Sequence, residues 1–139
     1  MDRGKYPEVT VGALIFSPKD EIFLMKSHKF RDKYVIPGGH IEFGEKAEDA
    51  LKREIKEETD LEIYGLNFLQ MQECICDNTA FYKSDRHFIF LDYTCRTNSR
   101  EAKLNDEGQS YVWASLKDAL RLDVETYTRR AIKVYLDKK

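Results

Sequence analysis

The chain has 139 residues, of which 42% are hydrophobic and 35% are charged, and its formal net charge is −2. This length suits one domain with a sizeable core. The near-neutral charge excludes a chain that is basic over its whole surface, as many nucleic-acid-binding proteins are. No apolar run approaches the ~20 residues that span a bilayer, and the N-terminus lacks the apolar stretch of a signal peptide. We therefore expect one cytoplasmic domain over residues 1–139, with neither a membrane nor a nucleic acid as a partner.

The first half of the chain is predicted to form strands followed by one acidic helix. Residues 9–18 are rich in β-formers and end at a Ser-Pro break, and residues 21–27 follow as the partner strand of a hairpin. A basic loop over 26–33 precedes a short strand within 34–45, which Pro-Gly-Gly interrupts. The spacing of apolar residues predicts a helix over 46–59.

The second half alternates strands and loops before it ends in helices. In chain order, the sequence predicts one or two strands with a bulge at Gly65, a loop, a strand, a polar loop, a short strand ending at the N-cap Ser115, and two helices: 61–76, 77–85, 87–97, 98–109, 111–115, 116–122 and 125–138. This order predicts an α/β domain with a mixed sheet and helices on its faces.

The helix over 46–59 carries acids on its apolar side. At about 100° per residue, Glu54 and Glu58 fall about 20° to either side of Ala47, which begins the apolar stripe, and Glu57 lies at its edge. Carboxylates so placed repel one another and lose solvation, and Mg²⁺ or Mn²⁺ would offset both costs. The alternative is an ordinary solvated acidic face.

The loop before this helix contains Pro37, Gly38 and Gly39. Two glycines permit backbone conformations closed to other residues and the close approach of a ligand, and the proline stiffens the entry. Such a loop could turn a carbonyl toward a cation held by the acids that follow. Taken alone, the three residues fit a plain turn equally well.

Residues 39–61 resemble the Nudix box, G-x5-E-x7-R-E-U-x-E-E-x-G-U, in which U is aliphatic. The defined positions hold Gly39, Glu45, Arg53-Glu54-Ile55-Lys56-Glu57-Glu58 and Leu61. Asp60 stands where the family has a helix-ending Gly, and Asp tolerates the left-handed conformation better than most residues. The chain is similar to the MutT branch of Nudix hydrolases over residues 8–136. This resemblance implies the Nudix fold, an α/β/α sandwich around a mixed β-sheet.

The resemblance also implies a metal site and a catalytic group. By position, Glu54, Glu57, Glu58 and the Gly38 carbonyl would bind Mg²⁺ or Mn²⁺. Arg53 would pair with Glu45 and orient Glu54, and whether Glu54 is a ligand, a base or both stays open. Glu107 is the candidate for a distal metal-binding acid, with three competing acids: Glu101, Asp106 and Asp77.

Substrate contacts are expected around the same loop. Lys26, Arg31 and Gly39 are the candidates for the phosphates, and Lys29 and Lys33 lie in the same basic stretch. Asp85 and Arg86 are the candidates for contacts near a base. Aromatic residues could stack on that base or pack in the core: Tyr34, Phe81 and Tyr82.

The function implied is metal-dependent hydrolysis of a nucleoside diphosphate linked to another group, with a small-molecule nucleotide as substrate. A nucleoside triphosphate cut to monophosphate and pyrophosphate is the leading substrate. The alternatives are a nucleotide sugar such as ADP-ribose or a GDP-sugar, a Nudix module that binds nucleotide or RNA without cleaving it, and an isoprenyl diphosphate isomerase. A homodimer is an open prediction. Cys74, Cys76 and Cys95 are interpreted as reduced packing thiols.

Overall fold

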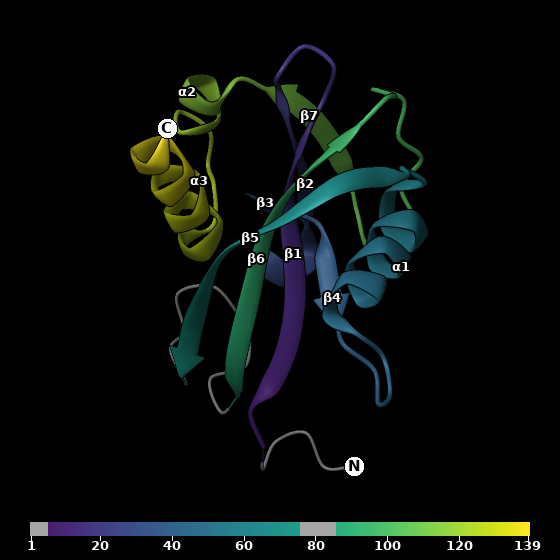
Figure 1. Cartoon of the computed structure of the whole chain (residues 1–139). Helices are drawn as coiled ribbons and strands as arrows, with labels where there is room; N and C mark the ends of the chain where they lie inside the picture. The colour runs from purple at the N-terminus through teal and green to yellow at the C-terminus, as the bar shows by residue number, and fades with distance from the viewer. Residues whose placement is uncertain (1–5, 76–85) are drawn as a thin grey trace.

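The computed structural model describes residues 6–75 and 86–139, which form a seven-stranded mixed sheet with helices on both faces (Figure 1). The strand order is β3-β2-β1-β6-β5, with β4 paired to β1 and β7 to β2. The elements are β1 (Glu8–Phe16), β2 (Ile22–Ser27), η2 (His28–Phe30), β3 (Lys33–Val35), β4 (Gly38–His40), α1 (Ala47–Thr59), β5 (Ile63–Ile75), β6 (His87–Thr97), β7 (Ser110–Ala114), α2 (Leu116–Ala119) and α3 (Thr126–Lys138). The predicted α/β/α sandwich is confirmed.

β1 is the central strand of the sheet, and its sequence explains why. Val11 and Ala13 are buried on one face, and Leu14 is buried on the other. A strand buried on both faces suits parallel pairing, and β1 runs parallel to β6 through nine residue pairs. The expected hairpin with β2 closes only at its turn, where Phe16 pairs with Ile22, because β4 pairs with β1 farther along.

Pro-Gly-Gly divides the predicted strand within 34–45 into β3 and β4, which pair with different neighbours. β3 pairs with β2, and β4 pairs with β1 through Gly12 and Gly38. Pro37 has no N–H to donate to a sheet, which accounts for the break between them. This division brings Gly38 and Gly39 of β4 next to α1.

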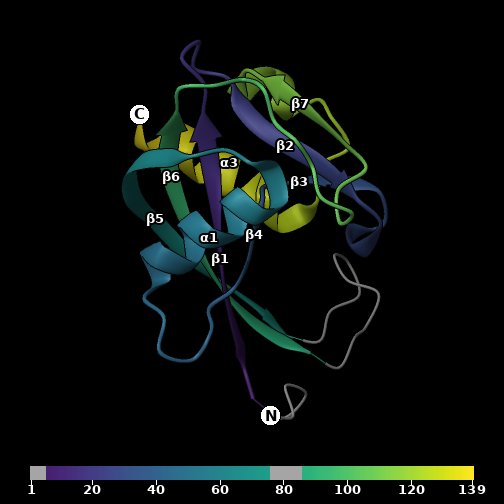
Figure 2. The ribbon, with the colours of Figure 1, turned by 90° about the vertical axis from the view of Figure 1, so that its right-hand side faces the viewer.

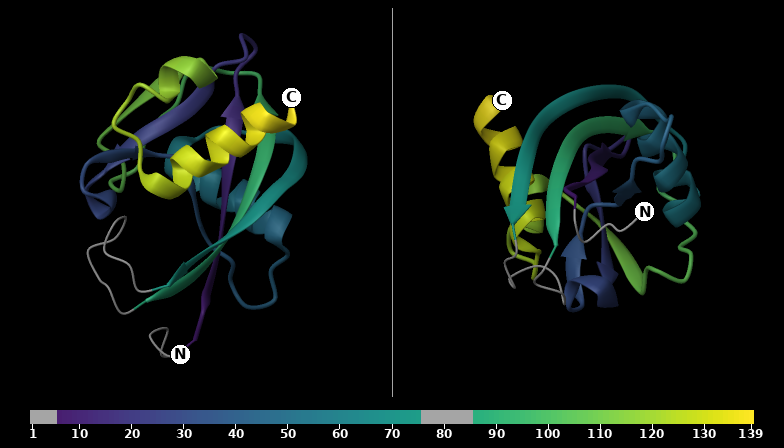
Figure 3. Two further views of the ribbon diagram at one scale, coloured as in Figure 1. Left: turned by 90° about the vertical axis from the view of Figure 1, so that its left-hand side faces the viewer. Right: turned by 90° about the horizontal axis from the view of Figure 1, so that it is seen from below.

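β5 is one long strand, although the sequence also allowed two. It pairs antiparallel to β6 with register shifts between Tyr64 and Asn67 and between Phe68 and Gln70. Gly65, predicted as a bulge, lies in the first shift with a φ of 65°. The irregularities bend the strand, and β5 and β6 curve together in Figure 3.

Each face of the sheet has its own hydrophobic core. Leu51 and Ile55 of α1 pack on the first face, and Ala131 and Ile132 of α3 pack on the second, so the sheet separates the two helices (Figure 2). Cys74 and Cys95 are buried thiols, and burial raises the pKa of the Cys95 thiol to about 12. These two thiols are packing groups in the structure. Cys76 lies outside the described residues.

The ends of two helices follow the local sequence. Asp60 terminates α1 with a φ of 62°, and its N–H donates to the Lys56 carbonyl, so Asp adopts the left-handed conformation expected at this position. Ser115 begins α2 as predicted, because its side chain accepts a hydrogen bond from the Asp118 N–H.

Candidate active site

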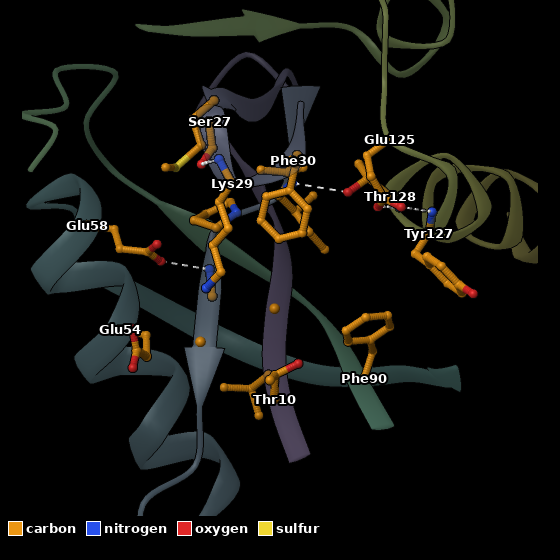
Figure 4. Close-up of a pocket in the computed structure, with 18 of the residues that line it drawn as sticks. Thr10, Ser27, Lys29, Phe30, Glu54, Glu58, Phe90, Glu125, Tyr127 and Thr128 are labelled. Atoms are coloured by element: carbon orange, nitrogen blue, oxygen red, sulfur yellow. Dashed lines mark hydrogen bonds between the residues drawn. The ribbon is translucent and has the colours of Figure 1, made fainter. Parts of the chain in front are cut away.

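A cavity of about 190 Å³ lies between α1 and β4 on one side and β6 and α3 on the other. Figure 4 shows the carboxylates of Glu54 and Glu58 at one end and the rings of Phe90 and Tyr127 at the other. One end therefore offers oxygen ligands, and the other offers apolar surface.

Gly38 and Gly39 of β4 let the acids of α1 approach the backbone. The Gly38 N–H donates a 2.8 Å hydrogen bond to Glu58 Oε1. A Cβ on Gly39 would overlap the carboxyl group of Glu54, and a Cβ on Gly38 would overlap the backbone of Val11. Close approach, with no positive φ, is what requires glycine at these two positions.

Arg53 holds the acidic face of α1 against the loop that precedes the helix. Its Nε and Nη2 donate to the two carboxylate oxygens of Glu45 at 2.7 and 2.9 Å, the expected pair. Its Nη1 lies 3.0 Å from Glu54 Oε1, and Nη2 also donates to the His40 carbonyl. These hydrogen bonds hold the pKa of Glu45 down at about 2 and fix the side chain of Glu54.

Burial in the cavity raises the proton affinity of two of its acids, Glu58 and Glu54. Burial raises the pKa of Glu58 to about 9, the charges of Glu107 and Glu54 add to this, and the Gly38 N–H opposes it. Burial also raises the pKa of Glu54, with Arg53 opposing. These carboxylates therefore cost free energy when ionised, and a bound cation would remove that cost.

Glu107 reaches the cavity because its loop is attached to the end of α1. The Lys103 N–H donates to the Thr59 carbonyl and the Asn105 N–H donates to the Glu58 carbonyl. Glu107 lines the cavity, and its charge contributes to the raised pKa of Glu58. Two of its competitors lie outside the lining, Glu101 and Asp106, and the third, Asp77, lies outside the described residues.

Glu57 occupies the solvent side of the acidic face. Its side chain is 57% exposed, lies 3.5 Å from Arg53 Nη1, and is outside the cavity lining. Among residues 6–75 and 86–139, no three His, Cys, Asp or Glu side chains are arranged to hold a metal ion. The donor set still fits a hard cation, because it consists of carboxylate oxygens that repel one another. The ligands would have to turn toward the ion.

Only some of the residues predicted to contact the substrate line the cavity. Lys26 lies outside the lining, with its Nζ 5.2 Å from the centre of the Tyr34 ring, because alternate residues of β2 face the cavity. Arg31 is exposed outside the lining, whereas Lys29 lines it, as does Gly39. Lys33, from the same basic stretch, pairs with Asp123 at 2.9 Å.

Of the two residues expected near a base, only Arg86 lies within the described residues. Arg86 forms a two-point ion pair with the buried Glu8, and its guanidinium group lies over the Phe88 ring. Glu8 in turn lies 2.8 Å from His40 Nε2. Asp85, Phe81 and Tyr82 lie outside the described residues.

Sequence reasoning missed the polar groups at the inner end of the cavity. Asp92 and Glu125 line it, with exposed fractions of 4% and 3%. Asp92 could have been found, because it interrupts an apolar strand that runs from Phe88 to Tyr93. Glu125 offered no comparable signal in a polar stretch before a helix.

Comparisons with known proteins agree with this arrangement. A NUDIX domain family model matches residues 6–135. The nucleoside triphosphatase NudI of Escherichia coli K12 is 30% identical over 109 residues, which cover 76% of this chain and 77% of NudI. The MutT NUDIX hydrolase from Burkholderia pseudomallei is 26% identical, with a TM-score of 0.78, and the match covers 92% of this chain and 97% of that one.

A more distant structure shows the likeness of fold alone. The NUDIX domain of Shewanella oneidensis NrtR, solved with ADP ribose, is 17% identical with a TM-score of 0.78 over 96% of this chain and 88% of that one. No helix in the part of the chain that the structure describes is long and apolar enough to cross a membrane. With a family model matched over nearly the whole chain and an acidic helix set against a glycine strand, the chain belongs to the NUDIX hydrolase family.

Proposed function

We propose that this hydrolase cleaves a nucleoside triphosphate to a monophosphate and pyrophosphate with Mg²⁺, or Mn²⁺ in its place. The observation that carries the proposal is the cavity with Glu54, Glu58 and Glu107 at one end and aromatic rings at the other. Phosphates can lie beside carboxylates only when a cation separates the negative charges. A nucleobase, in contrast, packs against apolar side chains. The name of its relative NudI, a nucleoside triphosphatase, supports the same substrate class.

The metal would be held by oxygen ligands on α1, β4 and the loop after β6. We assign this role to Glu54, Glu57, Glu58, Glu107 and the Gly38 carbonyl. When bound, the cation neutralises phosphate charge and makes water a better nucleophile. The Glu57 side chain is mostly exposed, so its carboxylate is able to turn toward an ion.

The chain's own residues supply the positioning and the proton transfer. Arg53 and Glu45 hold Glu54 against Gly39, where its carboxylate can accept a proton from the attacking water. The raised pKa of Glu54 suits this role, and the same group can also ligate the metal. Lys29, which extends into the cavity near Glu58 in Figure 4, is placed to contact phosphate oxygens.

A substrate panel tests the proposal. Metal-stripped protein is assayed with Mg²⁺, Mn²⁺ or EDTA on nucleoside triphosphates, ADP-ribose and a GDP-sugar, and the products are separated by chromatography. We expect monophosphate and pyrophosphate from triphosphates with metal only. Turnover in EDTA would overturn the metal assignment, cleavage of nucleotide sugars alone would favour that alternative, and binding without any cleavage would favour a non-catalytic module.

Glu57→Gln tests the placement of the site. Because Glu57 is exposed, the variant keeps its fold, and the loss of a charged ligand lowers kcat by about a hundredfold. The matched control is Glu48→Gln, an exposed acid in the first turn of the same helix. A Glu57→Gln rate within about threefold of the wild type, under ~0.7 kcal/mol of barrier, would place the site elsewhere.

A further inference from the structure

The inner end of the cavity carries a carboxylate that the proposed hydrolysis does not use. Asp92 of β6 is 4% exposed and lines the cavity on the same side as Phe90 and Tyr127. A buried acid costs free energy unless its oxygens are paired, and the neighbours of Asp92 from Phe88 to Tyr93 are apolar. The surrounding contacts show which of its two oxygens is paired.

One oxygen of Asp92 is fully engaged. Its Oδ2 accepts hydrogen bonds from Gln70 Nε2 at 3.1 Å and from Gln72 Nε2 at 2.8 Å. The Gln72 amide also donates to the Tyr127 carbonyl at 2.9 Å, so both of its N–H groups are in use. These contacts hold Oδ2 against two side chains of β5, one of which also donates to α3.

The other oxygen is accessible in the cavity that Asp92 lines. Within residues 6–75 and 86–139, Asp92 Oδ1 accepts no hydrogen bond, and it is not among the fully buried atoms that lack a partner, so it keeps accessible surface. The residue beside Asp92 on β1 is Gly12, which has no side chain to cover it. A Cβ on Gly12 would come within 3.2 Å of Ile36, so this glycine keeps the floor of the cavity open.

The open oxygen is an acceptor at neutral pH. Burial raises the pKa of Asp92 to about 6, and the amides of Gln70 and Gln72 oppose the rise, so the group is mainly ionised above that pH. Glu125, the other carboxylate in this part of the lining, accepts the N–H groups of Tyr127 and Thr128 at 2.8 and 3.1 Å. A ligand that enters here is met by acceptors, which pair with N–H groups and repel carbonyl oxygens.

We propose that Asp92 sets the base specificity of the substrate, with Oδ1 accepting a hydrogen bond from an exocyclic amino group of the base. The cavity then selects cytosine or adenine over the oxo bases uracil and hypoxanthine. Cytosine offers N–H at position 4, where uracil offers a carbonyl oxygen that would leave the carboxylate unpaired and repelled. This inference rests on the proposed function, because it needs a nucleotide whose phosphates lie at the acidic end.

The test compares substrates that differ only in this edge. We measure kcat/KM for dCTP against dUTP and for dATP against dITP, and binding of dCMP against dUMP by calorimetry. The amino member is expected to be favoured by about tenfold or more in each pair. In Asp92→Asn, which presents an amide in place of the carboxylate, we expect each ratio to fall by about tenfold. Asp137→Asn, an exposed acid on α3, is the matched control and keeps the wild-type ratios.

Each outcome decides the inference. Equal rates and equal binding for the amino and oxo members in the wild type would overturn it, whether or not the variant folds. Unchanged ratios in a folded Asp92→Asn would also overturn it. If the variant fails to fold, a dCTP analogue with hydrogen in place of the 4-amino group serves on the wild type, and a loss under about threefold contradicts the proposal.

The proposed function fails separately. If no triphosphate is hydrolysed, that function is wrong, but the ratio of dCMP to dUMP binding still tests Asp92, since the monophosphates need no turnover. If triphosphates are hydrolysed without preference for the amino base, the function stands and the role of Asp92 is wrong.

Discussion

Arg53 connects three acceptors that belong to different parts of the site. Its guanidinium group binds both oxygens of Glu45, one oxygen of Glu54 and the His40 carbonyl. A planar group with five N–H donors can do this, whereas the ammonium group of lysine cannot. The position of Glu54 therefore depends on the shape of the Arg53 guanidinium group as well as on its charge.

Arg53→Lys should lower kcat by about a hundredfold, because Glu54 loses its fixed position while the charge is kept. The melting temperature should change little, since Glu45 and Arg53 are partly exposed and such pairs contribute little to stability. Steady-state kinetics and a melting curve measure the two effects, and Arg121→Lys, at a mostly exposed arginine of the α2–α3 loop, is the control. A near-normal kcat would mean that charge alone positions Glu54.

Glu107 and Glu101 lie in one loop but have different surroundings. Glu107 lines the cavity beside Glu58, and Glu101 does not line it. Glu107→Gln should therefore lower kcat/KM at limiting Mg²⁺ by about tenfold or more, whereas Glu101→Gln should not. The assay is a Mg²⁺ titration of both variants at a fixed substrate concentration. The reverse order would transfer the distal role to Glu101.

At the scale of the elements, the sequence predicts what depends on local pattern. The limits of α1, the N-cap at Ser115, the bulge at Gly65 and the left-handed Asp60 all follow from residue type and spacing. The pairing of β4 with β1 and the attachment of the loop at Lys103 to α1 are long-range contacts that no local pattern encodes. Spacing therefore predicts which acids share the apolar side of α1, whereas it does not predict the inner wall with Asp92.

β4 shows how two neighbouring glycines differ in what they permit. A Cβ on Gly38 would overlap the backbone of Val11 and Gly12, which cannot move without shifting β1. A Cβ on Gly39 would overlap only the carboxyl group of Glu54, at the end of a flexible side chain. One glycine is needed for the fold, and the other is needed for the position of a catalytic group.

We expect Gly38→Ala to lower the free energy of unfolding by about 3 kcal/mol, the upper part of the range for overpacking. Gly39→Ala should cost about 1 kcal/mol, the displacement of one side chain from its rotamer, while kcat falls by about a hundredfold. Urea unfolding and turnover assays on the two variants measure this contrast. Equal destabilisation by both would show that the carboxylate of Glu54 is as rigid as the strand.

For the whole molecule, the buried acids make stability depend on pH when no metal is bound. Burial raises the pKa of Glu58 from 4.5 to about 9 and that of Asp92 from 3.8 to about 6. The folded protein therefore holds these protons more tightly than the unfolded chain does. The stabilisation is complete below about pH 4 and is lost as the pH rises through the two folded-state values. Above pH 6, Glu58 is the main contributor of the two.

In EDTA, the wild type should melt at a lower temperature at pH 9 than at pH 6, with a slope of at most about 1.4 kcal/mol per pH unit. Glu58→Gln should flatten this slope, because an amide keeps the acceptor for the Gly38 N–H without a charge to bury. Glu58→Leu is a poorer test, since it leaves that N–H without its partner at a cost of about 1–3 kcal/mol.

Mg²⁺ should raise the melting temperature of the wild type at pH 8.5 and do so less for Glu58→Gln. Melting curves in EDTA and in Mg²⁺ decide the matter. A slope that persists in Glu58→Gln would mean that the titration of other groups, and not that of Glu58, makes the stability depend on pH.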